Sequence, residues 1–579
     1  MINISKVSNG ILCVSLLAFI SFVAYILFIN QEVFYTAHDR SEFIFGAPFF
    51  HRLLSKPFGL IQYVGAWLTQ LFYRPALGAG VLAAIWALIF YVGSKAFRLN
   101  GSAAAMMLLP VACLLTSVVD LGYWVYILTL RGYWFSQSVG YLAMLLLLWV
   151  ARCTPRKWHI VWYLLGFCLY PVLGWFALLF VLCLMLCEKP TWREIAGIMV
   201  VLLSSIIWHR LFYSNLKFDD VVFAGLPRFV TSLDSATGLS KPFYVLGAVS
   251  VLISLCGRYL AKWFVPALCA VAGIAFTSSL MYSDKNYIDE MRMVRHAEND
   301  NWKEVLNIVA DAPKPTTTMV FLKNIALMNE GGLLDRSFKT DNRWSAISTA
   351  DSLHVSVLNI ASPLIYYNYG MTNEAIRLGF ENGVQYGFSP FYLKILVRCA
   401  LAKGDKELIE RYTTLLHHLP FYGNWQPASV TKTVGELQKS YPDEVTGVEN
   451  SDSYIVSSVS MWYESDIKVA SEQALFYSMI SCAPKRFWPS LRKYMKLHMD
   501  DYFPLHAQEA YILYMDRAPE EKRMMIPVEQ PVYERYKQFR EAMGRMVKPG
   551  MKVGELGEKM NKEWGDTYWW YYFFGRNIY

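Results

Sequence analysis

Charged side chains are scarce in this sequence. Only 17% of its 579 residues are charged, and no run of lysine and arginine is long enough to indicate a nucleic-acid-binding surface. An ordinary soluble domain is about 25% charged. The chain is instead 55% hydrophobic and 16% aromatic. Its formal net charge of +8 is modest for this length, and we attribute the excess to membrane topology, with no nucleic-acid partner.

Cysteine is also sparse in the polar half of the chain, where it could bind a metal or form a disulfide. Eight of the ten cysteines lie in or beside apolar segments, where a thiol is usually a small buried hydrophobe. Only Cys399 and Cys482 fall in the later, more polar half, and a disulfide between them stays open. No CxxC pair and no metal-ligand spacing occurs, so the sequence predicts no metal site.

The sequence lacks the common catalytic motifs. It has no GxSxG, no HExxH, no P-loop and no GxGxxG followed by an acid at the spacing of a dinucleotide site. His417 and His418 are adjacent, and neighbours on a helix point about 100° apart, so they do not converge on a metal. We expect no cofactor.

Long apolar runs dominate the first half of the chain. The segment "GILCVSLLAFISFVAYILFIN" has 21 residues and no charge, and a membrane span needs about 20 apolar residues. It follows Lys6 without a small-residue cleavage site, so we expect a retained helix rather than a cleaved signal peptide. Further spans are expected at 77–94, 103–120, 136–151, 194–211, 241–257 and 263–282.

The run "WHIVWYLLGFCLYPVLGWFALLFVLCLMLC" predicts a hairpin. As one helix it would be about 45 Å long, against a bilayer core of about 30 Å. Pro171 and Gly174 lie in its middle, and basic residues flank both ends. A turn at "YPVLG" places both basic clusters on the same side, which raises the expected number of membrane helices to about nine.

The distribution of basic residues predicts the orientation. The short loops that contain Lys95, Arg152 and Lys189 have a higher basic density than the two long loops on the other side. This favours a cytoplasmic N-terminus. With an odd number of spans, everything after Tyr282 would lie outside, in the periplasm of a bacterium.

The second half resembles a soluble helical-repeat protein. "HAENDNWKEVLNIV" has the pattern of one helix, a polar turn and a second helix. Gly370, Gly387 and Gly404 each precede a new helical stretch, as in degenerate tetratricopeptide repeats. Such hairpins form a concave surface that suits protein partners, and an irregular helical domain with no ligand is the alternative. The aromatic ending "WGDTYWWYYFFGRNIY" predicts a tail docked in a core or lying at the headgroup boundary, and a sugar-stacking platform is a further alternative.

Acids and arginines gather in the loops expected on the outer side. Arginines suit a lipid phosphate, and a carboxylate suits the deprotonation of an acceptor hydroxyl. We therefore predict Asp39 and Asp120 as catalytic residues and Arg131 and Arg210 as phosphate-binding residues. The alternative for Asp39 is a cap or polar edge of an interfacial helix in the amphipathic first outer loop, 31–76.

The first half resembles polyprenyl-phosphate-dependent glycosyltransferases of the GT-C class in architecture. That resemblance implies many helices, an essential acid just after the first helix, and often a periplasmic C-terminal domain. Asp39 maps onto this acid, although Arg40 follows it where the class usually has a second acid. Segments such as "NWKEVLNIV", "SPFYLKIL" and "TYWWYYFF" are similar to an uncharacterised bacterial inner-membrane family, which implies this architecture and no reaction.

These patterns together predict an all-α protein of the bacterial inner membrane. A polytopic, GT-C-like helical bundle is expected at 1–282, and a periplasmic tetratricopeptide-like domain at 283–579. One functional hypothesis is a GT-C-like glycosyltransferase, or a degenerate relative, that uses a polyprenyl-phosphate sugar donor. The other is a non-catalytic scaffold that contacts membrane lipids and binds an envelope protein through its repeats.

Overall fold

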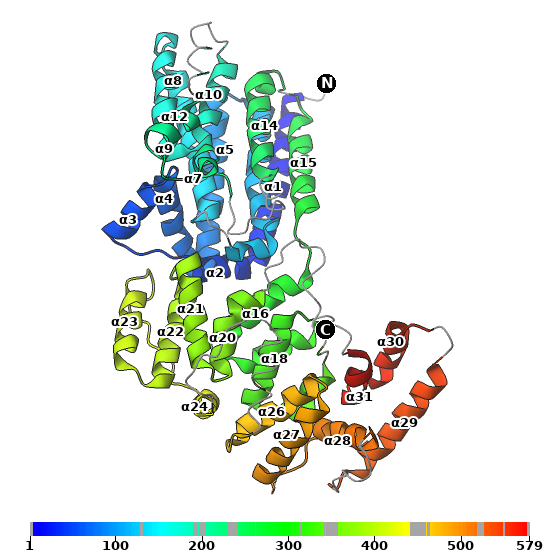
Figure 1. The fold of residues 1–579 in the computed structure, drawn as a ribbon. Coiled ribbons are helices and arrows are strands. Elements are labelled where there is room, and N and C mark those ends of the chain that lie inside the picture. The colour runs from blue at the N-terminus through cyan, green and yellow to red at the C-terminus, as the bar shows by residue number, and fades with distance from the viewer. Residues whose placement is uncertain are drawn as a thin grey trace. The chain divides into compact units, whose positions relative to one another are not determined.

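A computed structural model shows an all-α chain (Figure 1), with no strand in the part that it describes. That part comprises residues 4–127, 131–188, 195, 199, 201, 203–227, 241–260, 262–312, 315–340, 342, 357–440, 455, 459, 464–499, 501–517, 526–547 and 551–575. The prediction of an all-α fold is therefore confirmed.

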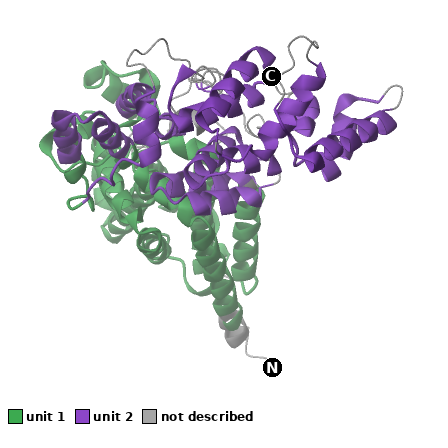
Figure 2. Cartoon of the chain, turned by 90° about the horizontal axis from the view of Figure 1, so that it is seen from below, with its two compact units in different colours: residues 1–283, 386–391, 416–424 green, residues 284–385, 392–415, 425–579 purple. Residues whose placement is uncertain are grey.

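The chain divides into two compact units (Figure 2). Unit 1 comprises residues 1–283 together with two short later segments, 386–391 and 416–424. Unit 2 comprises residues 284–385, 392–415 and 425–579. The two later segments of unit 1 are each less than ten residues long and have no long apolar run that would mark them as membrane segments.

Unit 1 is a bundle of apolar helices. Its elements are α1 (Ile4–Ile29), α2 (Gln31–Asp39), α3 (Ala47–Leu54), α4 (Gly59–Thr69), η1 (Gln70–Tyr73), α5 (Pro75–Ala96), η2 (Gly101–Met107), α6 (Leu108–Val119), η3 (Gly122–Ile127), α7 (Tyr133–Cys153), η4 (Arg156–Trp158), α8 (His159–Cys168), α9 (Tyr170–Leu173), α10 (Trp175–Cys187), α12 (Ser204–Leu211), α13 (Phe218–Val222), α14 (Lys241–Cys256), η6 (Gly257–Tyr259) and α15 (Val265–Leu280). Helix α7 packs against α4, α5 and α10, and α6 packs against α14 and α15.

Four helices of the described chain are long and apolar enough to cross a membrane: Gly10–Ile29, Pro75–Ala96, Gly101–Val119 and Tyr133–Cys153. They indicate that the protein associates with a membrane. Three shorter apolar helices accompany them, α10, α14 and α15. Most of the span expected at 194–211 lies outside the described residues, and the number of about nine spans stays a prediction.

The segment expected to form a hairpin is broken at the predicted turn. Helix α8 ends at Cys168 and α10 begins at Trp175, with the four-residue α9 between them. Gly174 has a φ of +56°, a conformation that favours glycine. The two arms pack together, since a Cβ on Gly166 of α8 would lie 2.5 Å from a methyl carbon of Val181 in α10. The chain therefore folds back on itself here.

The first outer loop of the prediction is helical and packs into the bundle. Helix α4 lies against the start of α7 so closely that a Cβ on Gly65 would lie 2.1 Å from the Ser136 hydroxyl oxygen. The amide of Phe58, just before α4, donates to the carbonyl of Pro171 at the hairpin turn, at 2.7 Å. Helix α3 buries Phe49 and Leu53 in a core with Phe43. Protein thus covers part of the apolar side of this loop, whereas Phe45, Leu60 and Trp67 remain exposed.

Unit 2 is built from short helices in series. Its elements are α16 (Lys285–Glu298), α17 (Trp302–Ala310), α18 (Thr317–Glu330), α19 (Leu333–Arg336), η7 (Ser337–Lys339), α20 (Val357–Asn368), α21 (Thr372–Tyr386), α22 (Pro390–Lys403), α23 (Lys406–His417), α24 (Lys432–Gln438), α26 (Lys468–Ile480), α27 (Pro484–Leu497), α28 (Leu505–Arg517), α29 (Gln530–Met546), α30 (Val553–Trp564), α31 (Tyr568–Trp570) and η10 (Tyr571–Gly575); the ends of α21, α22 and α23 belong to unit 1. Several consecutive helices pack against each other, as α16 does with α17 and α26 with α27.

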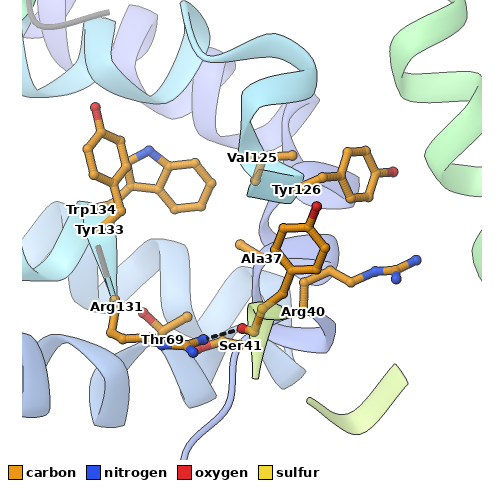
Figure 3. Close-up of a pocket in the computed structure, with 11 residues that line it drawn as sticks. Ala37, Arg40, Ser41, Thr69, Val125, Tyr126, Arg131, Tyr133 and Trp134 are labelled. Carbon is orange, nitrogen blue, oxygen red and sulfur yellow. Dashed lines mark hydrogen bonds between the residues drawn. The ribbon is translucent and has the colours of Figure 1, made fainter. Parts of the chain in front are cut away.

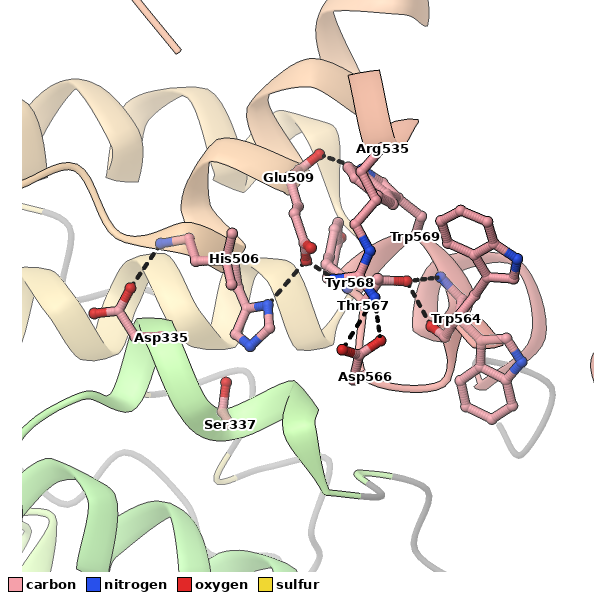
Figure 4. A network of polar contacts seen from close by, with 12 residues as sticks. Asp335, Ser337, His506, Glu509, Arg535, Trp564, Asp566, Thr567, Tyr568 and Trp569 are labelled. Atoms are coloured by element: carbon pink, nitrogen blue, oxygen red, sulfur yellow. Dashed lines mark hydrogen bonds and ion pairs between the residues drawn. The ribbon is translucent and has the colours of Figure 1, made fainter. Parts of the chain in front are cut away.

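The aromatic tail is docked in the core of unit 2 (Figure 4). Tyr568 and Trp569 are fully buried. The carboxylate of Glu509 accepts hydrogen bonds from the Tyr568 amide and from Nδ1 of His506, both at 2.8 Å, and the Trp569 indole donates to the Glu509 carbonyl. These residues are therefore docked in a core, which is one of the alternatives that the sequence left open. Their rings are buried and cannot stack on a sugar.

Candidate functional site

The polar candidates cluster where several helices of unit 1 end. Helix α2 follows α1 directly and packs against η1, η3 and the start of α5. Its apolar residues bury it, and the Phe34 ring stacks on Phe72 at 4.6 Å between centroids. Helix α6 ends near η3, and α7 begins shortly after it. This end of the bundle therefore gathers the residues just after Asp39 and the connection between α6 and α7 (Figure 1).

Asp39 is the last residue of α2 and is only 3% exposed. Arg40 follows it as the C-cap. Both hypotheses from the sequence, a cap or polar edge of an interfacial helix and a catalytic base, stay predictions for Asp39, because burial alone is compatible with either a structural or a chemical carboxylate.

Glu42 holds two arginines together. Its carboxylate lies 2.8 Å from Nη2 of Arg52 and 3.5 Å from Nη2 of Arg131. The Glu42 side chain is 5% exposed, whereas Arg52 is 56% and Arg131 21% exposed. A buried carboxylate needs such partners, because an unpaired buried charge is strongly destabilising. Glu42 therefore fixes the guanidinium of Arg131 in place.

Arg131 makes a second contact that the sequence does not predict. Its Nη1 atom donates to the carbonyl oxygen of Tyr386 at 2.7 Å (Figure 3). Burial lowers the pKa of Arg131 from its usual value, and the Glu42 carboxylate opposes that change. Arginine keeps its proton in proteins, so the guanidinium carries a positive charge at this end of the bundle. Tyr386 belongs to the segment 386–391 of unit 1.

Residues of the two later segments of unit 1, 386–391 and 416–424, contact α2 and its C-cap. The Arg40 guanidinium lies 3.2 Å from the ring centroid of Phe391, and 5.5 Å from that of Tyr126 in η3. The Nε2 atom of His38 lies 3.2 Å from the Tyr422 hydroxyl oxygen, a hydrogen-bonding distance. Cation–π and hydrogen-bond contacts of this kind hold the segments 386–391 and 416–424 onto the end of α2.

A small cavity opens between these groups (Figure 3). Its volume is about 50 Å³. Its lining residues are Ala37, Arg40, Ser41, Thr69, Val125, Tyr126, Arg131, Gly132, Tyr133, Trp134 and Tyr386. Ligand pockets for whole small molecules usually measure about 300–1,000 Å³. The cavity has room for a few water molecules, and in this structure it does not have room for a sugar.

Asp120 lies at the end of α6 but is not among the residues that line the cavity. Burial raises its pKa to about 8, and the charge of Lys241 lowers it only in part. Its Oδ1 atom is buried with no hydrogen-bond partner in the described structure. Asp120 is therefore a buried carboxyl at the end of α6 whose protonated form is favoured by burial.

Arg210 is exposed near the end of α12, a helix that packs against α9 and α13. It does not line the cavity with Arg131. No group of three or more His, Cys, Asp or Glu side chains that could hold a metal ion occurs among the described residues. Of the four residues proposed from the sequence, Arg131 alone lines the cavity.

Sequence reasoning assigned no role to three members of this site. Glu42, Arg40 and Tyr386 contact Arg131 or the cavity that it lines. The signal for Glu42 and Arg40 was their position beside Asp39 in a loop that follows an apolar helix. Tyr386 carried no signal, because it is 255 positions away from the arginine that it contacts.

The fold defines a class of all-α protein. One of its units is helical and membrane-associated, and the other is built from short helices in series. The chain belongs to the family described as "Family of unknown function (DUF6057)", whose match covers residues 6–575. No curated protein and no solved structure matches the chain. Membership in an uncharacterised family, which the sequence predicted, is thereby confirmed.

Proposed function

We propose that this protein is a non-catalytic scaffold of the bacterial cell envelope, whose helical unit 2 binds a protein partner. The observation that carries the proposal is the series of paired helices in unit 2, since repeats of this kind present extended surfaces to peptides and proteins. Its membrane helices would hold this surface at the bilayer.

One exposed apolar pair marks where a partner would bind. Phe380 and Val384 lie one helical turn apart on α21 and are 48% and 66% exposed. Large apolar side chains at positions i and i+4 are a typical anchor for a partner helix or peptide. Substituting Val384→Glu would place a charge in the centre of such a contact.

Affinity purification of the full-length protein tests the scaffold proposal. The expected result is the enrichment of a defined set of envelope proteins that is reduced for Val384→Glu. Val553 on α30 is 54% exposed and supplies the matched control, so Val553→Glu should capture the same proteins as the wild type. The proposal is wrong if nothing is enriched over an unrelated membrane protein, or if both variants behave as the wild type.

The second candidate is a GT-C-like glycosyltransferase that uses a polyprenyl-phosphate sugar donor. The observation in its favour is the position of the cavity, which adjoins the residues that flank Asp39 and contains two arginines. Asp39 would orient or deprotonate the acceptor hydroxyl, and Arg131 would contact the donor phosphate. The cavity would have to widen to admit a sugar.

The Asp39→Asn substitution tests this second candidate. It removes a base but keeps the shape, and the loss of a general base typically lowers a rate by about 10²–10⁴-fold. Envelope glycan profiles should change at an unchanged protein level and thermal stability. Unchanged glycans would leave the scaffold as the better proposal.

The proposed orientation has a cytoplasmic N-terminus and a periplasmic unit 2 in the inner membrane. Basic residues around the α8–α10 hairpin support it. Alkaline phosphatase fused after Tyr282 should be active, and a fluorescent reporter that folds only in the cytoplasm should be dark at the same position. The opposite pair of results would reverse the orientation.

A further inference from the structure

The cavity at the end of α2 is rich in hydrogen-bond donors. Arg131 has five N–H donors, and the protein contacts found for it in the described chain are those to Glu42 and Tyr386. Its side chain is 21% exposed and lines the cavity, so a group bound there can reach the guanidinium.

The Ser41 hydroxyl is a second donor of this kind. Ser41 lines the cavity and is only 8% exposed. No group in the described structure forms a hydrogen bond with its Oγ atom; its amide, by contrast, donates to the His38 carbonyl at 2.9 Å. The Oγ atom is not among the buried atoms that lack a partner, so it is reachable from the cavity and can donate to a group bound there.

The amino end of α7 adds backbone donors. Gly132, Tyr133 and Trp134 line the cavity where this helix begins. The first N–H groups of a helix have no acceptor within it, and no side chain caps this end of α7. Together they present a partial positive charge that favours an anion.

The charged side chains around the cavity also favour an anion. Two arginines, Arg40 and Arg131, are among the residues that line the cavity, and no aspartate or glutamate is. Glu42 pairs with Arg131 but does not line the cavity. The charged side chains on the cavity wall are therefore cationic, which suits an anion.

From these four features we infer that the cavity beside Arg131 binds a single phosphate-like oxyanion. Its volume of about 50 Å³ matches the space of a few water molecules, which one tetrahedral oxyanion would replace. Arginine with backbone N–H groups is a common pair of phosphate ligands in proteins. This inference depends on neither proposed function, since the anion can be a structural or a reacting group.

The oxyanion has two possible sources with the same chemistry, free inorganic phosphate and the headgroup of a phospholipid. The experiment uses the full-length protein and measures its thermal unfolding. In detergent, sodium phosphate is titrated against sodium chloride at equal ionic strength. In nanodiscs, phosphatidylcholine alone is compared with phosphatidylcholine that contains phosphatidic acid, which exposes a phosphomonoester.

The expected result is a rise in the unfolding temperature with one or both probes, because a ligand that binds only the folded state stabilises it. A rise with phosphate alone assigns a free anion, and a rise with phosphatidic acid alone assigns a lipid. No rise with either probe would overturn the inference.

Three variants show whether the effect comes from this cavity. Ser41→Ala removes one donor without changing the ion pairs and should weaken phosphate binding about tenfold, as for one hydrogen bond to a charged group. Arg131→Gln should abolish the rise, and Ser41→Ala keeps the test decisive if Arg131→Gln does not fold. Arg74→Gln is the matched control, since Arg74 is an exposed arginine before α5 that does not line the cavity. Equal rises in all three variants would contradict the assignment.

Discussion

A Cβ atom on Gly387 would lie 2.7 Å from the Oε2 atom of Glu42. Gly387 also has a φ of +101°, a conformation that side-chain-bearing residues rarely adopt. The backbone of segment 386–391 therefore reaches the ion pair of Glu42 and Arg131 only because residue 387 has no side chain. The Gly387→Ala substitution should displace either the segment or the ion pair.

We expect Gly387→Ala to lower the stability of unit 1 by about 1–3 kcal/mol more than a matched glycine substitution. Gly404→Ala is that control, because Gly404 has a φ of +71° and nothing within 4 Å of an added Cβ. Thermal unfolding of both variants in detergent measures the difference. Equal losses would show that only backbone conformation matters at residue 387.

Breaking the ion pair of Glu42 should be costly. Glu42→Gln leaves Arg131 without its carboxylate in a largely buried position, and breaking such pairs costs about 3–5 kcal/mol. The double variant Glu42→Gln/Arg131→Gln should lose less than the sum of the single losses, because the charge that remains, Arg52, is 56% exposed and hydrated. A double-mutant cycle by thermal unfolding measures this coupling.

An exposed pair supplies the control for this cycle. Arg377 and Glu381 lie 2.8 Å apart on α21, with side chains 37% and 54% exposed. Their coupling should be about 0–1 kcal/mol, as for other surface pairs. If the coupling between Glu42 and Arg131 is no larger than that of the control pair, the carboxylates of Glu42 and Glu381 are equally solvated.

Asp120 should make stability depend on pH. Burial raises its pKa from 3.8 to about 8, so the folded protein keeps a proton that the unfolded chain releases. The contribution is fully present below about pH 4 and is lost as the pH rises through about 8. Between these values the stability of the wild type should fall relative to Asp120→Asn, which carries no charge at any pH.

The pH effect is measured as the difference in unfolding temperature between wild type and Asp120→Asn across this range. Its slope should not exceed about 1.4 kcal/mol per pH unit, the value for one proton. Asp289, a partly exposed acid on α16 that is paired with Arg292, supplies the control, so Asp289→Asn should leave the pH dependence intact. A difference that grows in the opposite direction would show that the Asp120 charge is stabilised in the folded state.

The docked aromatic tail should stabilise unit 2. Trp569 is fully buried and its indole donates to the Glu509 carbonyl at 2.8 Å. Trp569→Ala should cost about 3–5 kcal/mol, as for other buried aromatic residues. Limited proteolysis should then cleave unit 2 faster, while Tyr533→Ala, at a position 41% exposed, should leave the cleavage rate near that of the wild type.

The sequence was informative where structure depends on neighbouring residues. Long apolar runs predicted the all-α class, because a single long uncharged segment in lipid satisfies its backbone hydrogen bonds as a helix. Pro171 and Gly174 indicated the break between α8 and α10, since each has a conformational restriction or freedom that acts within one turn. The dense aromatic ending left docking, the headgroup boundary and a sugar platform open, because its contacts with Glu509 lie 59 and 60 positions away.

The site was less predictable because its contacts join distant parts of the chain. Arg131 could be proposed from its charge and loop position, but its partners Glu42 and Tyr386 lie 89 and 255 positions away. The segment 386–391, YGFSPF, indicated a break between two helices but not which part of the chain it contacts. The roles of Asp39, Asp120 and Arg210 remain predictions for the experiments above.

The broken segment around Pro171 also bears on how the protein is made. Helices α8 and α10 have 10 and 13 residues, so they are about 15 and 20 Å long and neither crosses a core of about 30 Å alone. Under the proposed topology, the two arms would therefore enter the bilayer as a pair rather than as separate spans. Phe58 and α7, which contact Pro171 and α10, are synthesised earlier and would be in place when this pair arrives.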